Sequence, residues 1–461
     1  MFPERFIKRI RTQEYIDTNG LLNALKEPSP VSIRINSSKW NGKPHPSEPV
    51  PWCATGFYLE TRPSFTLDPL FHSGCYYPQE ASGMFLEQVF MQLVSGDGYI
   101  RVLDLCGAPG GKSTHLSSLI GSRGLLVSNE VIRTRASVLS ENMTKWGVTN
   151  TLVTQNDPSA FSELRGFFDV ILVDAPCSGE GMFRDTVAVN EWSVENSIHC
   201  SERQKRILTD IWPALNENGI LIFSTCTFNP GENEANIKWL VSKYQAEAVE
   251  LGVSEFNGIT RIDHEGKIGY GFYPGRIKGE GLFVSVIRKS GNPGKMTAGT
   301  RKKQSFEPVR SDLEVVREWT TFNTGNIIRS GDEVYYVPGK MEDYRILNQN
   351  LKLIRPGTKI CSVKKNGYVP AHELALSDGI RKDAFHKADL DYSQSLSYLR
   401  RDNIHPSGNP KGWFLPAYKG INLGFCNNIG SRINNYYPVE WRIRMRVPET
   451  TGRQVINWGN I

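Results

Sequence analysis

Two cysteines occupy matching positions in the sequence, each just past the end of an apolar run. Cys177 lies in DAPCSGEGMFR, which follows FFDVILV, and Cys226 lies in ILIFSTCTFNPGENE. Residues at the ends of buried parallel strands gather at one edge of a sheet, where ligands bind. Such a pair could be two buried thiols, a redox pair, or the machinery of covalent catalysis by a cysteine. The residues around the pair must decide between these interpretations.

A glycine-rich turn, DLCGAPGGKST from Asp104 to Thr114, lies between an expected strand and an expected helix. Glycines let the backbone approach a ligand, and a helix N-terminus offers free N–H groups. The spacing does not match a phosphate-binding P-loop, because Cys106 stands where the first glycine of that motif belongs. It does not match the G-x-G-x-x-G dinucleotide fingerprint either. The remaining interpretation is S-adenosylmethionine, whose methionine part lies against such a turn.

Acids at the ends of successive strands favour this cofactor. Glu130 ends the second strand, where a carboxylate can accept both ribose hydroxyls. Asp157 ends the third strand, where it can accept a hydrogen bond from the adenine amino group. One acid after a strand is usually a helix cap, but three in register are harder to explain in that way. The predicted cofactor-binding residues are Cys106, Gly107, Ala108, Pro109, Gly110, Gly111, Lys112, Glu130, Arg135, Asp157 and Asp174.

These residues need a scaffold of strands and helices, which the chain supplies between about residues 98 and 290. The strand-like runs are YIRVLDLC, LLVSNE, NTLVTQND, FFDVILVDAP, ILIFSTCT and GLFVSVIRK, with helical segments between them. This alternation predicts a doubly wound, Rossmann-like α/β fold with a parallel sheet and helices on both faces. One crossover joins the strands before Cys177 and Cys226, so we expect these strands to be neighbours, about 4.8 Å apart.

Sequence composition divides the rest of the chain. Residues 1–97 hold short mixed elements, and residues 291–310 read as a basic linker rich in Gly, Pro and Ser. Short strands follow in an intermediate small domain (311–395) and a last region (396–461), where WRIRMRV is expected to be a strand. The core of alternating strands and helices, which carries both cysteines, is predicted to span 98–290.

The composition is that of a globular protein of several domains, with 461 residues, 39% apolar and 22% charged residues. No run is long enough to span a membrane and no signal peptide is evident, so we expect a cytoplasmic protein, and a monomer by default. Eight cysteines without a CxxC pair predict free thiols and no metal site. The net charge of +6 is concentrated in the linker and after residue 399, which suggests a polyanionic partner or an ordinary solvated surface.

At this point the sequence resembles a family. DLCGAPGGKS, DAPCSGEGMFR and STCTFNPGENE are similar to motifs of the RNA cytosine-C5 methyltransferases of the Nol–Nop–Sun family. SIRIN, YYPQEASGMF and YPGRIKGEGLFV extend the likeness over most of residues 30 to 290. The resemblance implies S-adenosylmethionine as the cofactor and an N-terminal region that helps to bind RNA.

The resemblance also implies roles for the two thiols. Cys226 would attack C6 of cytosine and make C5 nucleophilic, and Cys177 would assist release of the product. Asp174 would hydrogen-bond the base at N3 and its amino group. Lys112 would position cofactor or substrate, or be a solvated lysine, and Arg184 would hold a phosphate or orient an acid.

The C-terminal region looks like the RNA-binding module of bacterial RsmF-type enzymes, a PUA-like β-barrel. Basic residues such as Arg432 and Arg442 alternate there with aromatic residues, of which at least half are expected to be core. This likeness implies methylation of C5 of a cytosine in small-subunit (16S) ribosomal RNA, in the small subunit and away from membranes. The alternatives are a tRNA cytosine-C5 methyltransferase of the same family and a catalytically silent rRNA-binding assembly factor. Comparing tRNA with ribosomal subunits as methyl acceptors would separate them.

Overall fold

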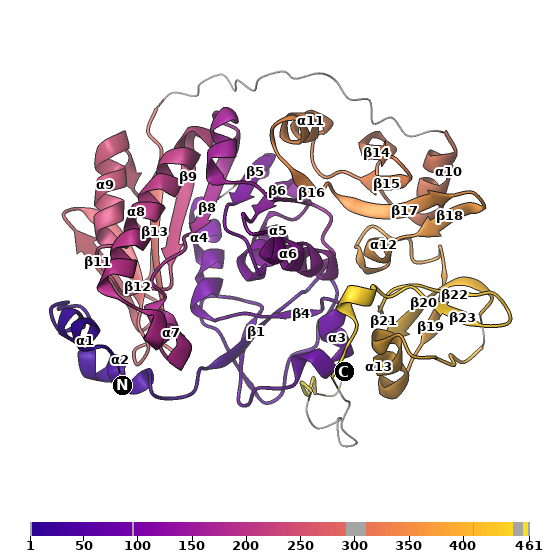
Figure 1. Cartoon of the computed structure of the whole chain (residues 1–461), viewed down its shortest axis with the longest axis horizontal. Coiled ribbons are helices and arrows are strands. Elements are labelled where there is room, and N and C mark those ends of the chain that lie inside the picture. Colours follow the sequence, from indigo (N-terminus) through magenta and orange to yellow (C-terminus); the bar gives the residue numbers. More distant parts are fainter. Residues whose placement is uncertain (1, 95, 292–309, 409, 446–454, 460–461) are drawn as a thin grey trace.

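The computed structural model describes the chain except for residues 1, 95, 292–309, 409, 446–454 and 460–461 (Figure 1). Within the described residues, a ten-stranded sheet forms the centre of the fold, and three smaller sheets belong to the N-terminal and C-terminal regions. The central sheet has the order β11-β12-β13-β9-β8-β5-β6-β7-β16, with β10 beside β13. Its strands are β5 (Ile100–Asp104), β6 (Gly124–Asn129), β7 (Thr151–Thr154), β8 (Phe168–Asp174), β9 (Leu215–Thr225), β10 (Glu247–Ala248), β11 (Ile259–His264), β12 (Lys267–Phe272), β13 (Leu282–Arg288) and β16 (Leu353–Arg355).

Strands β5 to β9 run parallel, and the strand order reverses between β5 and β8. The chain passes from β5 outward to β6 and β7 and then returns to β8 and β9, which confirms the predicted doubly wound fold. The last predicted strand, β13, is different, because it lies antiparallel to β9. A two-residue turn joins β11 to β12 and nine residues join β12 to β13, whereas a parallel pair needs a crossover of a dozen or more residues. The sheet is therefore mixed and not wholly parallel.

Helices cover both faces of this sheet, and the strand sequences explain why. Alternate side chains point to opposite faces, so that Leu103 packs in one core cluster and Val102 in the other. The first cluster includes residues of α8 and α9, and the second includes residues of α4, α5 and α6. These helices are α4 (Leu86–Leu93), α5 (Gly111–Ile120), α6 (Arg133–Trp146), α7 (Thr186–Glu191), α8 (Val194–Ile211) and α9 (Glu234–Tyr244).

The N-terminal region divides between two places. Helices α1 (Glu4–Ile10) and α2 (Thr18–Ala24) lie beside the β11–β12 side of the central domain (Figure 1). The small sheet β2-β3-β1-β4 lies on the side of α5 and α6 instead, with α3 (Pro69–His72) near its edge. Its strands are β1 (Val31–Ile35), β2 (Ser47–Pro49), β3 (Gly56–Leu59) and β4 (Tyr76–Pro78).

A buried arginine joins this small sheet to the central domain. Arg34 of β1 is 1% exposed, and its Nη2 donates to Oγ1 of Thr114 on α5 at 2.6 Å. Its Nε donates to Oε1 of Gln79 at 2.9 Å, and its guanidinium lies 4.4 Å from the ring centroid of Trp146. The small sheet thereby supports the helix that begins at the glycine-rich turn.

The C-terminal part holds two further sheets. The first contains β14 (Ile327–Ser330), β15 (Glu333–Tyr336), β17 (Thr358–Lys364) and β18 (Gly367–Pro370), accompanied by α10 (Arg310–Trp319), α11 (Met341–Asn350) and α12 (His372–Leu376). The second contains β19 (His386–Asp389), β20 (Gly412–Tyr418), β21 (Ile421–Asn422), β22 (Cys426–Asn428) and β23 (Ile433–Asn435), with α13 (Tyr392–Arg400). Strand β16 leaves this part and pairs with β7, so residues 311–395 extend the central sheet.

Several sequence predictions meet the structure here. The basic linker predicted over 291–310 lies almost wholly outside the described residues. The sequence predicts a strand at residues 441–447. Trp441 instead ends a 3-10 turn, Val439–Trp441, and the described residues of the segment form no strand. The domain boundaries stay predictions. Within the described parts of the chain, every helix is too short or too polar to span a lipid bilayer.

The buried arginine gives a stability prediction. Arg34→Met should lower the free energy of unfolding by about 2–4 kcal/mol, because it leaves the buried acceptors of Gln79 and Thr114 without a donor. Urea denaturation measures the change. The matched control is Arg133→Met on the exposed surface of α6, which should stay within about 0.5 kcal/mol of wild type. Equal losses in the two variants would contradict this role of Arg34.

Candidate active site

The two thiols meet at the carboxyl ends of neighbouring strands. Asp174 of β8 is in register with Ser224 of β9, and the cysteines follow each strand by a few residues. The structure brings Cys177 Sγ and Cys226 Sγ to 3.3 Å, and both thiols are free and partly exposed. The neighbouring parallel strands expected from the single crossover therefore place the pair at one point.

The environment of Cys177 favours its protonated form. The contact with Cys226 and then burial raise the pKa of Cys177 well above that of an ordinary thiol. The two sulfur atoms lie within hydrogen-bonding distance of each other. A pair of this kind offers one sulfur to react and one proton beside it.

Asp174 joins the site to the glycine-rich turn. Lys112 Nζ donates to Oδ2 of Asp174 at 2.9 Å, and Ser224 Oγ donates to Oδ1 at 2.7 Å. Burial opposes the charge of Lys112, but Asp174 outweighs it and raises the pKa of the lysine above its usual value. The side chains of Lys112 and Asp174 are 22% and 33% exposed. Lys112 is thus a partner of Asp174 and not a solvated lysine.

Two buried carboxylates hold the thiol loops together, and sequence reasoning missed both. Glu232, from the loop after Cys226, accepts hydrogen bonds from the backbone N and Oγ of Ser178 at 2.9 and 2.5 Å. Glu180, from the loop after Cys177, accepts a hydrogen bond from the backbone N of Phe228 at 3.0 Å. Each loop therefore binds a carboxylate of the other. The acids in SGEG and PGENE were the available signals, but their partners are distant in the sequence.

The N-terminal helix α1 also reaches this site. Arg9 Nη2 donates to Oε2 of Glu180 at 2.6 Å, and Trp192 Nε1 donates to Oε1 at 2.9 Å. The ring of Phe6 lies 4.9 Å from that of Phe183, measured between centroids. Residues from the start of the chain thus pack directly on the loop that carries Cys177.

The glycine-rich turn is held from its carbonyl side. Arg135 Nη2 donates to Ala108 O at 3.0 Å and Asn142 Nδ2 donates to Pro109 O at 2.7 Å, both from α6. Gly110 has φ of 122°, which favours glycine, and a Cβ on Gly107 would lie 2.7 Å from Ser113 Oγ. Helix α5 begins at Gly111, so the backbone N–H groups of Gly111 and Lys112 lie in its first turn. Burial, followed by the charge of Asp104, raises the pKa of Cys106 in this turn and keeps its thiol neutral.

The strand-end acids lie in one row. The order β8-β5-β6-β7 places Asp174, Asp104, Glu130 and Asp157 at or just after the ends of adjacent strands. Glu130 is buried, accepts from Ile132 N at 3.0 Å and lies 3.4 Å from Nη2 of Arg135.

Asp157, whose side chain is 44% exposed, caps a 3-10 turn (Pro158–Glu163) by accepting from Ser159 N at 3.1 Å. The hydrogen bonds from Ser159 lower its pKa. Asp157, a predicted cofactor-binding residue, therefore also caps the turn that follows it, which is the usual role of an acid after a strand.

Arg184 lies at the side of the site. Its Nε donates to Glu27 O at 3.1 Å and its Nη1 donates to Gly279 O at 3.2 Å. It lines a cavity of about 590 Å³ together with Lys26 and Ser29. The hydrogen bonds of Arg184 described here go to backbone carbonyls, and the roles expected for it stay predictions.

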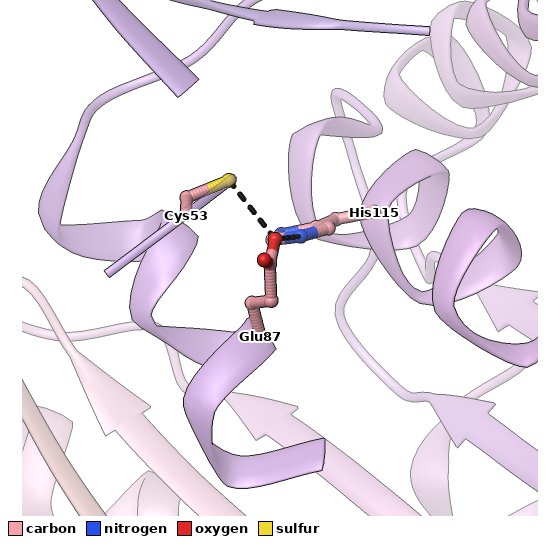
Figure 2. A group of neighbouring side chains, drawn as sticks. All are labelled: Cys53, Glu87 and His115. Atoms are coloured by element: carbon pink, nitrogen blue, oxygen red, sulfur yellow. Dashed lines mark hydrogen bonds and ion pairs between the residues drawn. The ribbon is translucent and has the colours of Figure 1, made fainter. Parts of the chain in front are cut away.

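Cys53, Glu87 and His115 form a buried group between the N-terminal region and α5 (Figure 2). Cys53 Sγ donates to Oε2 of Glu87 at 3.1 Å, and His115 Nε2 lies 3.2 Å from the same oxygen. Burial raises the pKa of Cys53 to about 12 and lowers that of His115 to about 4, so both are neutral donors to one carboxylate. Hydrogen bonding accounts for the contacts, and the expected absence of a metal stays a prediction.

A mixed sheet of this order, with the glycine turn after its first strand and an acid after the second, defines the Rossmann-like class of methyltransferases. A methyltransferase homolog protein from Pyrococcus horikoshii has this fold, with 27% identity and a TM-score of 0.53 over 62% of this chain and 95% of that one. NSun6 from the same organism, solved with SFG, is 19% identical over 63% of this chain and 99% of that one, with a TM-score of 0.51.

The family follows from the sequence comparisons. The model described as 16S rRNA methyltransferase RsmB/F matches residues 91–288, and models of the RsmF N-terminal, first C-terminal and PUA domains match 2–81, 314–377 and 385–443. Ribosomal RNA small subunit methyltransferase F of Salmonella newport is 31% identical over 95% of this chain and 96% of its own. That of Klebsiella pneumoniae is 29% identical over the same shares. The chain belongs to the RsmF family of RNA methyltransferases.

The buried acid of β5 gives a pH prediction. Burial, opposed by a hydrogen bond from Ser113, raises the pKa of Asp104 to about 7. The folded protein therefore binds this proton more tightly than the unfolded chain, and its stability falls as the pH rises from about 4 to about 7. Relative to wild type, Asp104→Asn should gain about 3 kcal/mol between about pH 5 and about pH 8.

Urea denaturation of the cofactor-free protein at several pH values measures this gain. The other titrating groups are shared by both proteins, so the difference between their curves isolates Asp104. Parallel stability curves would show that Asp104 is ionised throughout.

Proposed function

We propose that this protein methylates C5 of a cytosine in small-subunit (16S) ribosomal RNA, with S-adenosylmethionine as the methyl donor and a covalent bond between Cys226 and C6. The observation that carries the proposal is the thiol pair, Cys177 and Cys226 at 3.3 Å, beside the Lys112–Asp174 ion pair. A buried thiol pair or a redox pair would need neither the ion pair nor the row of strand-end acids. The chemistry of C5 methylation needs a nucleophile, a group that orients the base, and a means of release.

The Cys226 thiolate forms the bond to C6, and the electron pair of the C5–C6 double bond becomes available at C5. Asp174 would hydrogen-bond the base at N3 and its amino group, which stabilises the charge of the attacked ring. Lys112 and Ser224 fix the two carboxylate oxygens of Asp174, so its direction is set before the base arrives. The new C5–methyl bond would consume the electron pair that the attack made available, while the methyl–sulfur bond of the donor breaks and its electron pair stays on the sulfur.

Release reverses the attack. The C5 proton leaves to a base, the C5–C6 double bond forms again, and the Cys226–C6 bond breaks. Cys177 Sγ lies 3.3 Å from the departing sulfur, and as a thiol it would stabilise the departing thiolate by donating a hydrogen bond. The second thiol therefore serves the end of the reaction and not its beginning.

The residues at the strand ends fit S-adenosylmethionine, which supplies an electrophilic methyl group when bound. Asp104 Oδ1 is buried and has no hydrogen-bond partner among the described residues, so a donor from the cofactor could satisfy it. The glycines of the turn from Cys106 to Gly111 would allow a ligand to approach its backbone. Glu130 would accept the ribose hydroxyls and Asp157 would accept a hydrogen bond from the adenine amino group. Arg135 binds the turn and lies 3.4 Å from Glu130.

Ribosomal RNA as the substrate is supported by the relatives, which are named ribosomal RNA small subunit methyltransferase F. The match to a PUA domain and its basic surface agree with RNA binding. Arg432, Arg442 and Arg444 are exposed there, and Tyr436 is partly exposed, whereas Tyr437 is fully buried. The protein would work on the small subunit or its RNA in the cytoplasm, as a monomer and without a metal.

The thiol roles are tested with purified protein, labelled cofactor and small ribosomal subunits that lack the modification. Cys226→Ala should lose at least about 1,000-fold in methyl transfer and form no covalent adduct, because the nucleophile is gone. Cys177→Ala should accumulate a denaturation-resistant protein–RNA adduct, because release is slow. Gel separation under denaturing conditions and transferred label report the two quantities.

Other results would change the assignment. An adduct in Cys226→Ala and none in Cys177→Ala would reverse the roles of the two cysteines. Label on tRNA and none on the subunit would keep the chemistry and replace the substrate. Cofactor binding with no methyl transfer to any RNA would favour a silent assembly factor.

Cofactor binding is tested separately by calorimetry. Glu130→Gln should weaken the binding of S-adenosylmethionine by about 10–100-fold, because a charged acceptor of the ribose hydroxyls is lost. Glu163→Gln, at the exposed end of the 3-10 turn that Asp157 caps, is the matched control and should leave the affinity unchanged. Unchanged affinity in Glu130→Gln would remove Glu130 from the cofactor site.

A further inference from the structure

Glu232 is a fully buried carboxylate between the loops that carry Cys177 and Cys226. Its Oε2 accepts from the backbone N of Ser178 at 2.9 Å and from Gln204 Nε2 at 3.1 Å. Its Oε1 accepts from Ser178 Oγ at 2.5 Å and from Asn229 Nδ2 at 3.3 Å. Four hydrogen-bond donors thus surround the two oxygens. Burial raises the pKa of Glu232, and the hydrogen bonds from Ser178 and Gln204 oppose that shift and favour the ionised form.

These contacts hold both flanks of Cys177. Ser178, the next residue, is bound to Glu232 through its backbone and its hydroxyl. Gln204 binds Glu232 and also donates to the carbonyl of Pro176, the preceding residue, at 3.0 Å. Glu232 itself comes from the loop that follows Cys226. The carboxylate therefore ties the backbone around one thiol to the loop of the other.

The charge of Glu232 matters as well as its hydrogen bonds. The donors described above are neutral groups, so none of them cancels the negative charge. That charge adds to the contact with Cys226 and to burial in raising the pKa of Cys177. Glu180 makes the opposite tie between the same loops, but Arg9 neutralises it at 2.6 Å. Both buried carboxylates therefore join the two loops, but Glu180 is paired with an arginine whereas Glu232 is bound by neutral donors.

We propose that Glu232 is a positioning residue that fixes the Cys177 loop against Cys226 and keeps Cys177 in its protonated form, so that Cys226 alone acts as the nucleophile. This inference rests on the proposed function for its meaning in catalysis. The contacts of Glu232 and the protonation state of Cys177 are properties of the protein alone. The protonation state of Cys177 can therefore be tested without RNA or cofactor.

The first test follows alkylation of Cys177 by iodoacetamide against pH, in Cys226→Ala protein, with the modified peptide read by mass spectrometry. Removing Cys226 leaves burial and Glu232 to act on the thiol. The midpoint of the alkylation rate should lie above that of an ordinary thiol, about 8.5. Adding Glu232→Gln should move the midpoint to lower pH by at least about half a unit, because the negative charge is gone.

The matched control is Glu234→Gln, two residues along the same motif. Glu234 is also buried, but its Oε1 accepts from the hydroxyl of Tyr15 at 2.6 Å and belongs to a different contact. This substitution should leave the Cys177 profile unchanged. A Glu232→Gln profile that coincides with the control would overturn the proposal.

In the Cys226→Ala protein alone, a Cys177 midpoint at or below that of a free thiol already contradicts the proposal, whether or not Glu232→Gln folds.

A second readout links Glu232 to turnover. With the cysteines intact, Glu232→Gln should form the RNA adduct at a rate within about threefold of wild type and release product at least about tenfold more slowly. Equal losses in both steps would indicate a merely structural role and reject the proposal. If wild type methylates no cytosine, the proposed function fails, whereas the alkylation profiles still report on the role of Glu232.

Discussion

The loops after β8 and β9 are locked together by carboxylates that each loop receives from the other. Glu232 binds the backbone beside Cys177, and Glu180 binds the backbone of Phe228 beyond Cys226. Both carboxylates are buried, and buried charges persist only where hydrogen bonds or counter-charges satisfy them. The same contacts that satisfy the charges bring the two sulfur atoms to 3.3 Å. The geometry of the reactive pair is therefore a consequence of how two buried charges are solvated by the protein.

The location of the site could be predicted from the sequence because it depends on sheet order. Apolar runs marked the strands, a single crossover made β8 and β9 neighbours, and strand-end residues had to converge. Cys177, Cys226 and Asp174 are therefore found together as expected. Lys112 was left open between two roles, because its partner Asp174 is distant in the chain and only the folded sheet brings them to 2.9 Å.

The contacts that sequence reasoning missed are long-range ones between polar residues. Nothing near Arg9 indicates that its partner is Glu180, and nothing near Arg34 indicates Thr114. The direction of β13 was also missed, since a strand buried on both faces reads alike in parallel and antiparallel pairs. The pairing of β16 with β7 across an expected domain boundary was also missed, because short strands carry little periodicity in the sequence.

The central claim is that the methyl group reaches C5 of cytosine. The most direct test incubates the protein with S-adenosylmethionine and unmodified small subunits, digests the RNA to nucleosides and identifies the methylated product by mass spectrometry against standards. The account predicts 5-methylcytidine, formed by wild type and absent with Cys226→Ala. A methyl group on an exocyclic nitrogen or on a ribose hydroxyl would contradict it, because neither product needs a covalent bond from a cysteine to C6.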